Sequence, residues 1–431
     1  MYKSVDLIES PRFFMRKAKK IAQTDLMDSL LKQAEKIQAE LVAQRRWLHQ
    51  NAETGFALKD TFSFIESELR KMGCTPKRCG KAGLTATIGQ GDRCVLLRAD
   101  ADALPIKEET GLPFACKNGN MHACGHDLHT AMLLGAVKLL KAREERLNGV
   151  VKVFFQSAEE ILEGAKEGIE EGILQNPKVD VALMVHTLTG VELPTGTLVV
   201  ASAGVSAPAA DYFSVQIKGK GCHGSAPWKG VDALTVAGHT LIALQEISAR
   251  ELSIANPAVL TVGSLQSGEA GNVLSDRASL HGTLRAFDER VREKVKMRVE
   301  EISKNVAKAF RAKAKTVYGG GCPTLVNDER LSAFATKTLT ALLGKERTFT
   351  SQTLGGDVRE NSGGSEDFAY IAHRVPSVMV AVASGERKDG YEFPLHHPKA
   401  KFDESALCIG SAVYAQVASE WLKEVKKDGA L

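Results

Sequence analysis

Apolar residues along the chain fall into two kinds of pattern, one with helical spacing and one without it. Residues 24–48 place apolar side chains three and four positions apart, which predicts one long amphipathic helix, and residues 62–72 predict a second. Short, nearly continuous apolar runs occur at residues 94–98, 150–155, 181–185 and 377–382. Such runs are typical of strands buried on both faces of a sheet. Together the patterns predict an α/β domain with a mostly parallel sheet covered by helices.

The middle of the chain has a different order of elements. Strands are expected at residues 212–218, 258–265, 278–287 and 313–318, and helices at residues 231–252 and 288–311. The order βαββαβ is that of a compact α+β unit. We therefore predict a catalytic domain made of residues 24–207 and 320–431, with a smaller α+β domain inserted at residues 208–319. Residues 1–23 are basic and weakly patterned, and they form a predicted N-terminal extension.

Residues able to bind a metal follow the predicted strands. The first strand runs into Asp102, the second into Glu159 and Glu160, and the third ends on His186, while His396 follows the fourth at a distance. Ligands of such sheets gather beyond the carboxyl ends of the strands. A single carboxylate at a strand end is commonly a solvated cap. Three successive strands that end in this way predict a shared metal site.

A short loop adds a thiol and an imidazole. Within residues 121–129, Cys124 and His126 are separated by one glycine, so that both side chains can turn toward one ion. On its own, a Cys-Gly-His sequence is more typical of a polar loop with a half-buried cysteine. The strand ends described above favour the metal site instead.

The adjacent residues Glu159 and Glu160 offer two roles that amide hydrolysis needs. A zinc-type ion polarises the carbonyl and lowers the pKa of bound water to about 7. A carboxylate that lies beside the metal without binding it can serve as the base for that water. Because neighbouring residues at a strand end point in different directions, one glutamate can ligate while the other serves as base.

The composition limits the class of partner. The chain of 431 residues is 44% hydrophobic and 25% charged, and its net charge of +4 includes no basic block typical of a nucleic-acid groove. We therefore expect a small molecule or peptide as partner, and no nucleic acid. No apolar run approaches the ~20 residues that span a bilayer, so no membrane partner is expected. The eight cysteines lack a disulfide spacing, and the first residues lack a signal-peptide core, which predicts a reduced, cytoplasmic enzyme.

Seven stretches of the chain resemble one family of hydrolases. They are residues 97–105, 122–127, 155–160, 219–223, 282–285, 364–368 and 395–398. In sequence and order they are similar to the dinuclear-metal aminoacylase and carboxypeptidase family of amidohydrolases. Within that family they resemble the branch of auxin–amino-acid conjugate hydrolases and hippurate hydrolases. The resemblance extends from about Arg45 to the C-terminus.

This resemblance implies roles for individual residues. The implied ligands of two divalent metal ions per subunit are Cys124, His126, Glu160, His186 and His396. Glu159 would be the general base, and Asp102 a carboxylate that orients the site. In the inserted domain, the resemblance implies that His223, Asn272 and Arg285 bind the oxyanion or the substrate carboxylate. It also implies that this domain is a lid and forms the interface of a homodimer.

The expected function is hydrolysis of the amide bond of N-acyl amino acids or short peptides, by a metal-activated water and a glutamate base. Thiolate and imidazole ligands favour zinc, while manganese, cobalt and nickel stay open. One alternative is a cysteine hydrolase in which Cys124 is the nucleophile and His126 the base. Another is a non-catalytic, metal-dependent binding protein on the same scaffold. Sensitivity to chelators distinguishes the metal-dependent amidohydrolase from the cysteine hydrolase. A turnover assay distinguishes it from the non-catalytic binding protein.

Overall fold

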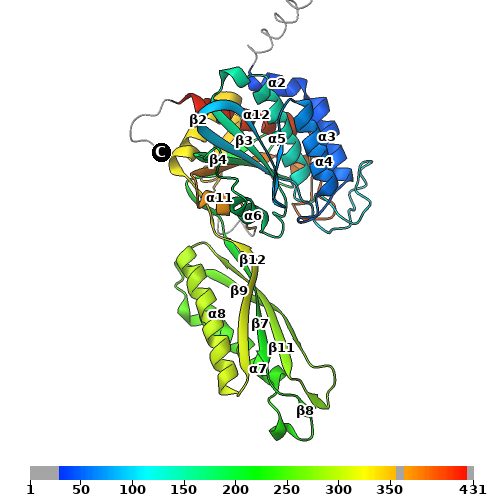
Figure 1. Cartoon of the computed structure of the whole chain (residues 1–431), viewed down its shortest axis with the longest axis vertical. Helices are drawn as coiled ribbons and strands as arrows, with labels where there is room; N and C mark the ends of the chain where they lie inside the picture. The colour runs from blue at the N-terminus through cyan, green and yellow to red at the C-terminus, as the bar shows by residue number, and fades with distance from the viewer. Residues whose placement is uncertain (1–28, 356–363, 425–431) are drawn as a thin grey trace, which may run out of the picture.

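The chain folds into two units joined at one end of the smaller unit (Figure 1). The computed structural model describes residues 29–355 and 364–424. The predicted extension at residues 1–23 lies outside these ranges. The larger unit is built on a seven-stranded sheet and the smaller unit on a four-stranded sheet. No helix of the described ranges is long and apolar enough to cross a membrane.

The larger unit contains the two ends of the described chain. Its helices are α2 (Leu30–Lys36), α3 (Gln38–Gln50), α4 (Lys59–Lys71), α5 (His126–Lys141), α6 (Gly164–Glu170), α9 (Glu329–Leu343), α11 (Ala369–Ala372) and α12 (Ala406–Lys423). The strands of its sheet are β1 (Lys77–Cys79), β2 (Gly83–Asp100), β3 (Asn148–Gln156), β4 (Val181–Leu188), β5 (Leu198–Val200), β14 (Thr348–Thr350) and β15 (Ser377–Ala383). A separate pair is formed by β6 (Gly204–Ala207) and β13 (Leu325–Asn327).

The central strands of this sheet run parallel. The order is β1-β2-β4-β15-β5-β14, with β3 also paired to β2, and the pairs β2–β3, β2–β4 and β4–β15 are parallel. Successive residues of β2 pack into different cores, since Leu97 belongs to the cluster under α5 and α12 and Leu96 to the cluster under α6 and α11. The sheet is therefore covered on both faces, as the apolar runs predict.

The predicted helix at residues 24–48 is in fact two helices within its described part. α2 ends at Lys36 and α3 begins at Gln38, and Ile37 between them has a φ of −101° and a ψ of 6° that interrupt the helix. Ile37 is half-buried against the main core. The apolar spacing therefore continues across the break, which is why the pattern alone indicates a single helix.

The smaller unit, which we call the insert, follows the predicted order βαββαβ in its main elements. These are β7 (Ala209–Lys218), α7 (Ala233–Glu246), β9 (Ala258–Ser267), β11 (Arg277–Ala286), α8 (Glu289–Ala309) and β12 (Lys313–Cys322), with the short strands β8 (Cys222–His223) and β10 (Val273–Leu274) at one end. The sheet order is β12-β7-β11-β9, and every pair is antiparallel. α7 and α8 pack on one face of this sheet and enclose a separate apolar core.

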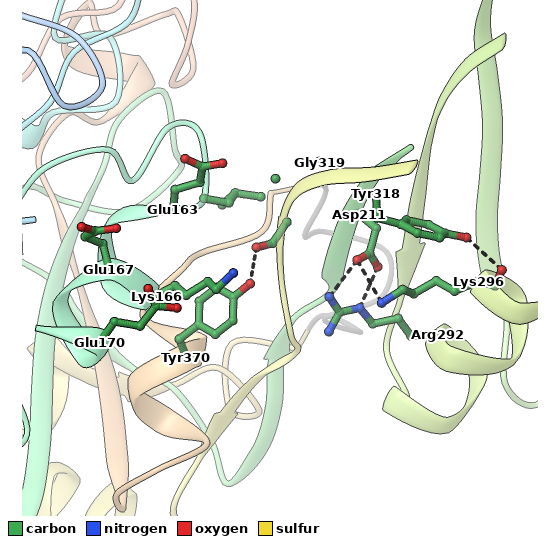
Figure 2. A pocket seen from close by; sticks show the side chains of 13 residues that line it. Glu163, Lys166, Glu167, Glu170, Asp211, Arg292, Lys296, Tyr318, Gly319 and Tyr370 are labelled. Carbon is green, nitrogen blue, oxygen red and sulfur yellow. Dashed lines mark hydrogen bonds and ion pairs between the residues drawn. The ribbon is translucent and has the colours of Figure 1, made fainter. Parts of the chain in front are cut away.

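The two crossings between the units lie side by side. β7 leaves the larger unit where β12 returns to it, and a Cβ on Gly321 would lie 2.4 Å from the carbonyl oxygen of Ala210. A cleft of ≈ 360 Å³ lies beside this junction. Its lining includes Glu163 and Tyr370 of the larger unit and Asp211 and Arg292 of the insert (Figure 2). At the insert side, Arg292 donates to both carboxylate oxygens of Asp211 at 2.7 and 2.8 Å. This buried pair ties α8 to the base of β7.

Candidate metal centre

The structure brings five of the predicted ligands together at the carboxyl ends of the central strands. His186 lies on β4, Glu160 follows β3, Cys124 and His126 lie at the start of α5, and His396 lies in the loop after β15. Their ligand atoms form two groups that share the thiol, Cys124–His126–His186 and Cys124–Glu160–His396. Within each group all the ligand atoms lie within 4.8 Å of one another.

The separations between these atoms suit a common ion. Cys124 Sγ lies 3.7 Å from His186 Nε2, and Glu160 lies 3.8 Å from His126 Nε2 and 3.6 Å from His396 Nε2. Two ligands of one tetrahedral zinc ion, each at about 2.0–2.3 Å from it, lie about 3.3–3.8 Å apart. The pairs are thus too far apart for strong hydrogen bonds and close enough to share a metal.

Two buried atoms of the group have no partner. His126 Nε2 and Glu160 Oε1 make no hydrogen bond within the part of the chain that the structure describes. A buried polar atom without a partner costs about 1–3 kcal/mol. Divalent cations held by the two ligand groups would satisfy both atoms, so these residues fit a metal centre on their own geometry.

Local backbone geometry directs the Cys-Gly-His ligands. Gly125 has a left-handed φ of 87°, and a Cβ there would lie 2.4 Å from Thr187 Oγ1. Only glycine therefore allows the loop to turn into α5 at this point. His126 donates from Nδ1 to the backbone carbonyl of Asp102 at 2.8 Å. This bond fixes the tautomer and leaves Nε2 facing the other ligands.

The Asp102 carboxylate holds the turn that carries both glutamates. It accepts the backbone N–H of Glu159 at 3.0 Å and that of Glu160 at 3.2 Å. Glu160 lies with Cys124 and His396, whereas Glu159 lies within 4.8 Å of the Glu366 carboxylate. Both side chains lie close to His126 Nε2, at 3.9 Å for Glu159 and 3.8 Å for Glu160. Only Glu160 also groups with Cys124 and His396, and only Glu159 groups with Glu366 and Asp367, which fits one ligand and one base.

Burial governs the ionisation of the centre. It raises the pKa of the Cys124 thiol to about 12, and it also raises the pKa of Glu159, with the nearby Glu366 and Glu160 adding to that shift. A protonated thiol is a poor ligand, so metal binding must release this proton. A cation in the centre opposes both shifts, because it stabilises the charged forms.

Arg98 is a buried cation beside the centre that was not predicted as one of its residues. Its guanidinium lies 2.7 Å from Asp100, 2.8 Å from Asp367 and 3.0 Å from Glu366, and it donates to Gln156 at 2.9 Å. None of its surface is exposed. It stands inside an apolar run, and two of its partners lie far downstream, so only the fold brings the charges together.

His129 was likewise not predicted as part of the site. Its Nδ1 lies 2.5 Å from Asp100 Oδ1, and its Nε2 accepts the backbone N–H of Thr187 at 2.9 Å. The carbonyl of Thr187 in turn accepts from His186 Nδ1 at 2.7 Å. Arg98, Asp100 and His129 therefore form a buried chain that ends on the backbone beside a proposed ligand. The spacing of His129, three residues after His126 at a helix start, is the signal that could have indicated it.

Replacing Arg98 with methionine should destabilise the protein by about 3–5 kcal/mol, because three buried carboxylates lose their cation. Denaturant unfolding of the metal-free protein measures this change. Arg93→Met is the matched control, since Arg93 lies on the same strand and is partly exposed. An equal, small effect of both substitutions would contradict the assigned role.

The predicted residues of the insert divide into two sets. His223 and Asn272 are exposed and lie near β8, at the end of the insert farthest from the larger unit (Figure 1). Among the described residues they join none of the candidate metal groups of their own chain. Arg285 instead reaches the larger unit, where its Nη1 donates to Ser365 Oγ at 3.1 Å. Ser365 directly precedes Glu366, whose carboxylate groups with that of Glu159, the predicted base.

Comparisons with known proteins agree with this geometry. The family model described as peptidase family M20/M25/M40 matches residues 96–420. The N-acetyl-L-cysteine deacetylase of Bacillus subtilis is 36% identical over 379 residues, which cover 87% of this chain and 86% of that protein. An IAA-amino acid hydrolase of Arabidopsis thaliana is 33% identical over a match that covers 90% of this chain and 86% of that protein.

Solved structures give the same result. A crystal structure described as a dinuclear metal binding peptidase from the M20 family, from Bacillus subtilis, has a TM-score of 0.73 at 31% identity, covering 91% of this chain and 100% of that chain. A Staphylococcus aureus protein described as a putative aminohydrolase has a TM-score of 0.82 at 30% identity, covering 91% and 99%.

The fold and the ligand groups define a metal-binding hydrolase that acts on amide bonds. More specifically, the chain belongs to peptidase family M20/M25/M40, as the family match over most of its length shows. The family predicted from the sequence motifs is thereby confirmed.

Proposed function

We propose that this protein releases an amino acid from an N-acyl amino acid, with short peptides as a second substrate class. The observation that carries the proposal is the pair Glu159–Glu160, whose backbone is held by Asp102. Only Glu160 of this pair groups with Cys124 and His396. Relatives named as N-acetylcysteine deacetylases, IAA-amino acid hydrolases and carboxypeptidases support this class of substrate.

We propose two divalent ions in the centre. Two ligand groups that share Cys124 support this number, with His126 and His186 in one group and Glu160 and His396 in the other. The thiolate and imidazoles favour zinc, while manganese, cobalt and nickel remain compatible with the mixed donors. Bound ions of this kind polarise the substrate carbonyl and lower the pKa of water.

The residues of the chain then supply the proton transfers and the orientation. Glu159 accepts the proton of the attacking water and later gives it to the leaving amine. Asp102 keeps the base in place through the backbone of the turn. Arg285 binds the carboxylate of the released amino acid, and its hydrogen bond to Ser365 Oγ holds the guanidinium.

The cysteine-hydrolase alternative is disfavoured by the surroundings of Cys124. A nucleophilic cysteine needs a lowered thiol pKa, whereas burial raises that of Cys124 to about 12. The same mechanism would leave Glu159 and Glu160 without a role. Reversible loss of activity in chelator distinguishes the two mechanisms, because cysteine chemistry does not depend on a metal.

A hydrolysis screen tests the proposed function. The metal-stripped protein is reconstituted with Zn²⁺, Mn²⁺, Co²⁺ or Ni²⁺ in turn and assayed on N-acetyl, N-benzoyl and indole-acetyl amino acids and on dipeptides. Release of the amino acid by at least one metal form is expected. Binding of these compounds without any turnover would favour the non-catalytic alternative.

Amidation of the substrate carboxylate should lower kcat/KM by about 10- to 150-fold, because Arg285 would lose a charge-assisted hydrogen-bond pair worth about 1.5–3 kcal/mol. Arg285→Met should lower kcat/KM for the free acid to a similar extent and make the enzyme indifferent to amidation. Arg277→Met, an exposed arginine of the same strand, is the matched control. An Arg285→Met enzyme that still prefers the free acid would refute this role.

For the domains, we propose that residues 24–207 and 320–431 form the catalytic domain, and residues 208–319 a lid and dimerisation domain. The paired crossings of β7 and β12 support a lid that moves as a body. An open sheet edge at β9, with Val259 exposed on it, supports a homodimer through the insert. We propose the cytoplasm as its compartment, which the eight unpaired cysteines support.

A further inference from the structure

The outer face of the insert sheet is uncovered and basic. α7 and α8 occupy the other face, where they pack on the apolar residues of the strands. On the outer face lies a shallow depression of ≈ 790 Å³, whose charged lining residues are Lys218, Arg277, Lys313 and Lys315. All four of these side chains are exposed. The depression lies outside the candidate metal groups, and it has no part in the function proposed above.

The register of the strands places these cations directly beside one another. Lys218 of β7 is opposite Arg277 of β11 on one side and opposite Lys313 of β12 on the other. Neighbouring strands lie about 4.8 Å apart, so three charges occupy a row about 10 Å long. Lys315 adds a fourth charge two residues along β12, opposite the Gln216 amide. Like charges that face each other across strands destabilise a sheet.

The protein itself does little to neutralise this row. Arg277 lies 3.8 Å from Asp276, and both side chains are largely exposed. Lys218, Lys313 and Lys315 make no ion pair within residues 29–355 and 364–424. Lysines on an edge strand guard against aggregation, which accounts for Lys313 and Lys315 on β12. This reason does not extend to Lys218 and Arg277, because β7 and β11 are inner strands.

We propose that this depression binds a small oligophosphate anion, such as a chain of two or three phosphate groups. The row of cations matches a row of negative charges, and arginine can bind a phosphate group through two hydrogen bonds. Gln216, Gln266 and Ser279 line the same depression and supply neutral donors. Its volume lies within the range of small-molecule sites, about 300–1,000 Å³.

The lining also argues against larger anionic partners. Among the described residues that line the depression there is no aromatic side chain, so nucleobases find no stacking surface. A stable protein partner buries about 800 Å² on each side around apolar anchors, and the charged row offers none. A compact polyanion without a nucleobase needs neither a stacking surface nor apolar anchors.

Calorimetric titration of the metal-loaded protein with inorganic tripolyphosphate at low ionic strength tests this site. The double variant Lys218→Gln/Lys313→Gln should bind at least about 10-fold more weakly than the native protein, because it loses two charge-assisted contacts. The matched control is Lys304→Gln/Lys308→Gln, which makes the same charge change at exposed positions of α8. Binding by this control should be unchanged, and both double variants should keep native amide hydrolysis.

Each other outcome overturns the proposal. Equal affinity in both double variants would mean that tripolyphosphate binds elsewhere, for example at the bound metal ions. Orthophosphate should bind at least about 10-fold more weakly, so an affinity equal to that of tripolyphosphate would indicate general attraction of anions. Tighter binding of a glutamate-rich peptide or of single-stranded DNA would assign the face to a macromolecule instead.

Discussion

Replacing Glu159 with glutamine should lower kcat by about 10²- to 10⁴-fold while the metal content stays native, because the amide cannot accept the proton of the attacking water. The substitution keeps the size of the side chain, and the backbone bond from Glu159 N–H to Asp102 does not depend on the carboxylate. None of the five proposed ligands is altered. The loss should therefore appear in turnover and not in metal binding.

Metal analysis and steady-state kinetics on one preparation check this expectation. Glu163→Gln provides the matched control, since Glu163 is an exposed glutamate just beyond the same turn and should keep a native rate. A rescue of Glu159→Gln by raised pH would also be informative, because hydroxide would replace the base. A Glu159→Gln enzyme with near-native kcat and full metal would remove Glu159 from the role of base.

The sequence predicts the large features of this fold because burial alone determines them. A continuous apolar run indicates a strand covered on both faces whichever strand it pairs with, so the runs that became β3, β4 and β15 were visible. The strands β1, β5 and β14 have three residues each and were not predicted, since such short segments carry no pattern. The break at Ile37 was hidden for a related reason, because a residue can leave the helix and still pack on the core.

The residues of the candidate centre were likewise predictable from the sequence only in part. Its proposed ligands were found because they lie at strand ends and in a short motif, where sequence position implies position in space. Arg98 and Asp367 lie in two of the family-like stretches but were not assigned to the centre, because their pairing joins residues 269 positions apart. Charges that depend on long-range pairing become visible only when the fold places both partners.

The position of His223 leads to the last prediction. The histidine is exposed on β8, at the tip of the insert, and is far from the metal centre of its own chain (Figure 1). Its Nδ1 accepts the backbone N–H of Ser225 at 3.1 Å, so in the neutral ring Nε2 carries the hydrogen. An exposed N–H donor that has no role in its own site suits the oxyanion of a partner's site. The loss of one such donor lowers kcat by about 10²- to 10³-fold.

Mixing the two inactive variants Glu159→Ala and His223→Ala should therefore restore activity if the subunits exchange. In a mixed dimer, one site combines the intact Glu159 of one chain with the intact His223 of the other. With half of the dimers mixed and one of two sites rebuilt in each, activity should recover to roughly a quarter of native. The control mixes Glu159→Ala with the double variant Glu159→Ala/His223→Ala, which cannot rebuild any site. If tagged subunits exchange and activity stays at the level of this control, His223 does not act across the interface, and its exposure at the tip needs another explanation.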